Sequence, residues 1–125
     1  MIATNLLRVS VIIILVGMIV GMAMGSMQDF RLAPAHAHLN LLGFVSLFLA
    51  GLYYQAVPQA AASTLAKWHA SIAVIGAIVF PIGIAMVLLY GPQYELLTIS
   101  TSVVAFLGMV LFAVVVFRFG APQRI

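Results

Sequence analysis

Four long apolar runs, joined by short polar links, take up almost the whole chain. Each run reaches the roughly 20 apolar residues that a helix needs to cross a bilayer. We expect the helices at about residues 6–27, 34–54, 65–89 and 94–117. Lipid offers the backbone no hydrogen bonds, so only helices or a closed barrel can span it, and these runs are too long for barrel strands. The sequence therefore predicts an all-α fold, an integral membrane four-helix bundle.

The composition agrees with a membrane location. Of the 125 residues, 66% are hydrophobic and only 6% are charged, which is far more apolar than a soluble domain. The links are too short for a further domain, so we interpret residues 1–125 as a single unit. The first run has features of a signal peptide, but Val9–Gln28 carries no charge and is long enough to span. We expect it to be retained.

The few charged residues indicate how the helices are oriented. With four spans both termini share one side, and the charges divide between that side (Arg8, Lys67, Arg118 and Arg124) and the other (Asp29, Arg31 and Glu95). Because Lys and Arg favour the cytoplasmic side, we expect both termini there, with the chain in an inner (plasma) membrane. The cations lie beside apolar runs, so we expect contact with membrane lipid and no binding of nucleic acid.

The second run opens with an unusual group of polar residues. At 100° per residue, His36, Asn40 and Gly43 share one helix face, which continues to Tyr54, whereas His38 points about 200° away from His36. A polar side chain inside a membrane span is costly, so it marks a functional site or a paired structural contact. For His36 both interpretations stay open: a ligand of a metal or cofactor, or a hydrogen-bonded histidine at the wet end of a helix.

Two other features have plain structural interpretations. Gly17, Gly21 and Gly25 recur at steps of four and predict close approach of another helix, from this chain or from a second copy. His69 follows Lys67 near the start of the third run, where we expect a histidine at the membrane interface.

The polar opening of the second run resembles a known family. The residues Arg31-Leu32-Ala33-Pro34-Ala35-His36, followed by Gly43-Phe44 and then Tyr53-Tyr54-Gln55, are similar to the second helix of subunit I of the haem-copper oxidases. The nearest members are the cbb-type cytochrome oxidases and their nitric oxide reductase relatives. The resemblance covers about 25 residues well and extends weakly into the third run, over Trp68 and residues 76–83.

This resemblance implies a b-type haem near the outer face. The family's histidine at the position of His36 is an axial haem ligand, and Arg31 would pair with a propionate. Imidazole and guanidinium suit these two roles chemically. The family's other haem and copper ligands come from later helices that this chain lacks, so we expect no reduction of oxygen or nitric oxide by the chain alone. A sixth ligand would come from a methionine such as Met22 or from a second subunit, or the site would stay five-coordinate.

Two alternatives stay open. The main prediction is a haem protein that transfers electrons or senses a gas. Since the chain has no cysteine, copper would need imidazoles and thioethers, and His36 and His38 lie close in sequence to four methionines (Met18, Met22, Met24 and Met27). The other alternative is a cofactor-free structural subunit of a respiratory membrane complex. Whichever of these functions applies, we expect the chain to form a homo-oligomer or to be a subunit of a larger membrane complex.

Overall fold

The computed structural model describes residues 1–121, which are helical and contain no strand. The elements are α1 (Ile2–Met27), α2 (Ala33–Asn40), the π-helical segment η1 (Leu41–Ser46), α3 (Leu47–Ala56), α4 (Pro58–Ala61), α5 (Thr64–Tyr90), the 3₁₀ turn η2 (Pro92–Tyr94) and α6 (Glu95–Phe119). Four spans are long and apolar enough to cross a membrane: Ile2–Met27, Ala33–Ala56, Thr64–Tyr90 and Pro92–Phe119. This confirms the predicted all-α bundle, and the chain is a multi-pass membrane protein.

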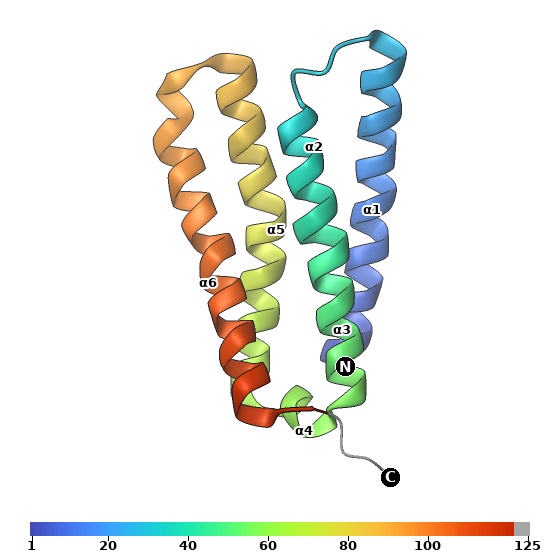
Figure 1. The fold of residues 1–125 in the computed structure, drawn as a ribbon. Coiled ribbons are helices and arrows are strands. Elements are labelled where there is room, and N and C mark those ends of the chain that lie inside the picture. The colour runs from blue at the N-terminus through green and yellow to red at the C-terminus, as the bar shows by residue number, and fades with distance from the viewer. Residues whose placement is uncertain (122–125) are drawn as a thin grey trace.

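Two helical hairpins make up the bundle. The first pairs α1 with the continuous span formed by α2, η1 and α3, and the second pairs α5 with α6. The hairpins meet mainly along α2 and α5, so the helices stand side by side in the order α6, α5, α2–α3, α1 (Figure 1). The start of α1 and the end of α6 lie at the same end of the bundle, beside the short helix α4.

Glycines on α1 receive side chains from the second span. A Cβ on Gly17 would overlap the Asn40 amide, and a Cβ on Gly21 would lie 2.9 Å from Cε1 of His36. By contrast, Gly25 has nothing within 4 Å of its missing Cβ. The close helix approach predicted from the glycine ridge (Gly17, Gly21 and Gly25) therefore occurs within this chain. It involves Gly17 and Gly21.

The π-helical segment changes the face that the second span presents to α1. A π-bulge inserts an extra residue and so rotates the following residues by about 100°. Consistent with this, Gly51 is the residue of α3 whose missing side chain makes room for Leu7 of α1. Tyr54 instead bonds to His69 of α5. The prediction that one helix face continues from His36 to Tyr54 is therefore wrong for α3, the part of the span that follows η1.

Small residues also bring α5 and α6 together. A Cβ on Gly76 would lie 2.7 Å from the Cα of Ala105, so the two backbones are almost in contact. Near the other end of this pair, the hydroxyl of Thr98 donates a 2.8 Å hydrogen bond to the carbonyl of Gly83. In membranes, small residues commonly allow helices to pack closely, and hydroxyl groups commonly form hydrogen bonds between helices. Helix α5 continues through Pro81.

The charged residues gather as the sequence indicates. Arg8 of α1, Lys67 of α5 and Arg118 of α6 belong to the end of the bundle where α1 begins, and Asp29 and Arg31 belong to the link at the opposite end. Arg124, which contributes to the predicted orientation, lies outside the described residues. The cytoplasmic placement of this end stays a prediction.

Candidate functional site

His36 lies in the first turns of α2, where its ring is held between two helices. Pro34 suits the start of this helix, because its missing N–H would have no partner in a first turn. The imidazole packs on Gly21 of α1, and its nearest ring atom lies 2.9 Å from where a Cβ would be. Any larger residue at position 21 would therefore take the place of the ring.

The His36 ring is only partly satisfied by hydrogen bonds. Its Nε2 lies 3.4 Å from Nδ2 of Asn40, one helical turn further on. Nδ1 of His36 and Oδ1 of Asn40 are buried and have no hydrogen-bond partner among the described residues. Leaving a buried polar atom unpaired costs about 1 to 3 kcal/mol, so such atoms need an explanation.

The same imidazole lines an apolar groove between α1, α2 and α5. The groove encloses about 370 Å³, and His36 is the one polar side chain among the residues that line it. Most of its wall is aliphatic, with Ile13, Val16 and Val20 from α1, Leu39 from α2, and Pro81 and Ile82 from α5. Val16 and Ile82 are 48% and 54% exposed, so the groove opens on the surface that faces lipid in a bilayer.

His38 turns to another part of the bundle. Its Nδ1 lies 2.7 Å from the carbonyl oxygen of Pro34, and its ring packs edge-on against Phe80 of α5, with the ring centroids 5.0 Å apart. His38 does not line the groove. In the described part of the chain, no group of three or more His, Cys, Asp or Glu side chains is close enough to hold a metal ion.

Arg31 is occupied by a neighbouring carboxylate. Its guanidinium binds Asp29 in a bidentate manner, with Nη2 2.7 Å from Oδ2 and Nε 3.0 Å from Oδ1. These hydrogen bonds from Arg31 hold the pKa of the Asp29 carboxyl below its ordinary value. The Arg31 side chain is 65% exposed, so it lies at the surface beside the outer end of α2.

The methionines near His36 in the sequence differ in their exposure. Met22, Met18 and Met27 are 70%, 55% and 68% exposed and face away from the bundle. Met24 is buried. Met22, a predicted source of a sixth iron ligand, thus turns outward although it follows Gly21 directly.

A second buried histidine lies at the opposite end of the bundle. His69 is only 2% exposed, so its ring is buried inside the bundle, and its predicted location at the level of the membrane interface stays a prediction. The hydroxyl of Tyr54 lies 2.8 Å from Nδ1 of His69, and the His69 ring stacks on Phe112 at 4.9 Å between centroids. The short link between the second and third spans places Tyr54 and His69 at similar depth, and this signal in the sequence could have suggested the pair.

The fold and these sites define a class, a multi-pass α-helical membrane protein with an imidazole in a lipid-facing groove. Comparisons with protein-family models, with curated proteins and with solved structures find no match for this chain. The residues of the site are therefore the basis on which a particular function can be inferred.

Proposed function

We propose that this protein is a small membrane-bound b-type haem protein in which His36 binds the haem iron. Electron transfer or gas sensing is the activity that such a site supports. One observation carries the proposal: His36 is the single polar side chain among the residues lining an apolar groove, and its Nδ1 is buried without a partner among residues 1–121. Within a membrane span such a side chain marks a functional site by default.

The residues fit a haem in their chemistry. Imidazole is a standard axial ligand, and an aliphatic groove suits the apolar face of a porphyrin. The groove volume of 370 Å³ is at the lower end for ligand sites. A macrocycle would be partly enclosed, and its remaining surface would meet lipid or another protein chain. When bound, haem iron supplies one-electron transfer or the binding of a diatomic gas.

The neighbouring residues have supporting roles in this proposal. Gly21 leaves room for the imidazole, and the Asn40 amide lies at one ring nitrogen while the other has no partner in the part of the chain that the structure describes. Groups that hold the second nitrogen of a ligating histidine fix its orientation. Arg31 would exchange Asp29 for a propionate, which is chemically an equivalent partner because both are carboxylates. Gly43 contributes by admitting Ile13 of α1, which lines the groove.

The resemblance of residues 31–55 to the second helix of haem-copper oxidase subunit I supports the same assignment for His36. The proposal is limited to haem binding with electron transfer or gas sensing. The haem near the outer face and the inner-membrane location are likewise parts of the proposal.

A second candidate is a cofactor-free structural subunit of a larger membrane complex. The observation in its favour is the close fit of His36 and Asn40 to Gly21 and Gly17, which a purely structural contact would also produce. No corresponding observation favours copper handling, because Met18, Met22 and Met27 are exposed on the outside of the bundle.

Titration of the purified protein with haemin distinguishes the two candidates. The wild type should bind one haem with a Soret band shifted from that of free haemin, and His36→Ala should abolish the shift. His38→Ala is the matched control, since that ring lies outside the groove, and it should bind as the wild type does. Equal binding by all three proteins would remove His36 as the ligand. A folded wild type that binds no haem would favour the structural subunit.

A further inference from the structure

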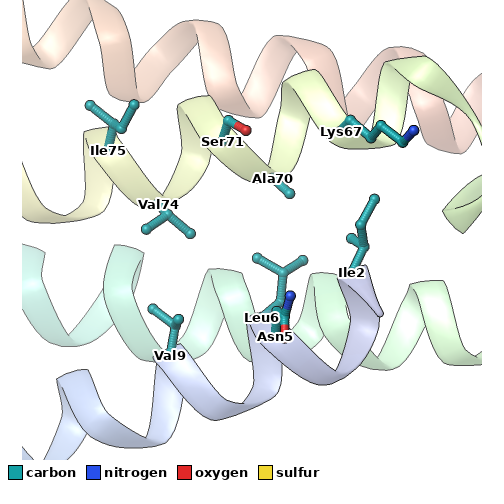
Figure 2. A pocket seen from close by; sticks show the side chains of 9 residues that line it. All are labelled: Ile2, Asn5, Leu6, Val9, Lys67, Ala70, Ser71, Val74 and Ile75. Atoms are coloured by element: carbon teal, nitrogen blue, oxygen red, sulfur yellow. The ribbon is translucent and has the colours of Figure 1, made fainter.

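A second groove lies at the other end of the bundle, between the first turns of α1 and of α5. It encloses about 460 Å³ and shares no residue with the groove at His36. Figure 2 shows its two walls, with Leu6 and Val9 on α1 opposite Ala70 and Val74 on α5, and Lys67 beyond them near the start of both helices.

Three polar side chains at this groove have no partner among the described residues. Asn5, Lys67 and Ser71 make no hydrogen bond or ion pair with another residue of the range 1–121. Ser10, Ser100 and Ser102 donate their hydroxyls to a backbone carbonyl of the preceding turn. Ser71 does not, so its hydroxyl is free to donate to another molecule.

Polar and apolar residues follow one another with depth along the groove. Lys67 and Asn5 lie in the first turns of their helices, and the ends of a membrane-spanning helix are the parts nearest the membrane surface. Ser71 and Val74 follow Lys67 at steps of four and seven residues, which places them on the same face of α5, progressively deeper. A charged or polar mouth above an aliphatic channel matches a phospholipid, whose phosphate lies at the surface and whose acyl chains run inward.

We propose that this groove binds one anionic phospholipid from the leaflet at that end of the bundle. The Lys67 ammonium attracts the phosphate, the Asn5 amide and the Ser71 hydroxyl donate hydrogen bonds to it, and an acyl chain packs along Leu6, Val9 and Val74. Basic pockets between helices are typical sites for anionic headgroups. A helix from another chain is a poorer occupant, because it would bury the Lys67 ammonium without a counter-charge.

Native mass spectrometry of the detergent-solubilised protein tests this proposal. The protein is titrated with phosphatidylglycerol and, separately, with phosphatidylcholine of identical chains. We expect the wild type to bind the first phosphatidylglycerol more tightly than phosphatidylcholine by about fivefold, which is the contribution of one lysine near an anionic surface. Lys67→Gln should remove this preference. Arg118→Gln is the matched control, since it deletes a cation at the same end of the bundle on α6 and should keep the preference.

Two further variants separate the charge from the channel. Lys67→Arg should retain the preference for the anionic lipid, and Ser71→Phe should weaken binding of both lipids by filling the channel. Preference for phosphatidylglycerol that persists in Lys67→Gln, or that falls equally in Arg118→Gln, would overturn the proposal. So would lipid binding unchanged in Ser71→Phe, or a dimer of the wild type that excludes lipid from this groove.

Discussion

The imidazole of His36 occupies the notch left by Gly21, where a Cβ would lie 2.9 Å from the ring. This relationship joins two features that are far apart in the sequence, the glycine ridge of α1 and the histidine of α2. The orientation of the proposed haem ligand therefore depends on Gly21, a residue without a side chain. Substitutions in α1 should therefore alter the site on α2.

Gly21→Ala should disturb the site because the added methyl group overlaps the His36 ring. Overpacking of this kind costs about 1 to 3 kcal/mol. We expect a lower midpoint of thermal unfolding and weaker haem binding. Gly25→Ala, with no neighbour within 4 Å of the added Cβ, is the matched control and should retain both properties. Similar behaviour of the two variants would show that the notch has no role in holding the ring.

His36 and Asn40 should be energetically coupled in the protein without haem. Their side chains are 3.4 Å apart within α2, and contacts of this type in membrane proteins contribute about 0.6 kcal/mol on average. A double-mutant cycle with His36→Ala and Asn40→Ala, read by reversible unfolding in detergent, measures the coupling. Strictly additive effects would contradict a positioning role for Asn40.

Tyr54→Phe should destabilise the protein because it removes the hydroxyl that lies 2.8 Å from the buried His69. Leaving His69 without this partner costs about 1 to 3 kcal/mol. Tyr53→Phe is the comparison, since the Tyr53 hydroxyl donates to the carbonyl of Gly120 in a more exposed place. Thermal unfolding followed by circular dichroism should show the larger loss for Tyr54→Phe, and an equal or smaller loss would contradict the assigned contact.

Asp29 should titrate at a lower pH than an isolated aspartate, because hydrogen bonds from Arg31 stabilise its charged form. A lowered pKa in the folded state means that the ion pair stabilises the fold at neutral pH, and that this contribution is lost as the pH falls through the folded-state pKa. Asp29 is the single aspartate of the chain, so carbon-13 NMR of its carboxyl group can follow the titration. Arg31→Gln should raise the pKa towards the ordinary value. No change would show that the ion pair does not persist in solution.

The sequence predicts the four spans well because their length and apolarity are local properties. Each predicted helix agrees with the structure to within four residues at either end, as in 65–89 against Thr64–Tyr90. The turn α4 and the π-helical segment η1 have no comparable local signal. The extra residue of η1 rotates α3 relative to α2, and for this reason the face beginning at His36 does not extend to Tyr54.

The candidate site could be predicted only in part. The cost of a polar group in a membrane span singles out His36 from sequence alone, but its contacts depend on how helices pair. Pairing places Gly21 under the ring, turns His38 towards Phe80 and leaves Met22 exposed on the outside of the bundle. The burial of His69 also requires three helices to meet, since Tyr54, His69 and Phe112 come from α3, α5 and α6.

The absorption spectrum of the protein purified from cells supplied with a haem precursor tests the central proposal most directly. If His36 binds the haem iron, we expect a Soret band and a pyridine haemochrome spectrum of haem b in the wild type and in His38→Ala. We expect His36→Ala to give a colourless, folded protein. A colourless wild type that also fails to take up haem, or a His36→Ala variant with an unchanged spectrum, would contradict the proposal.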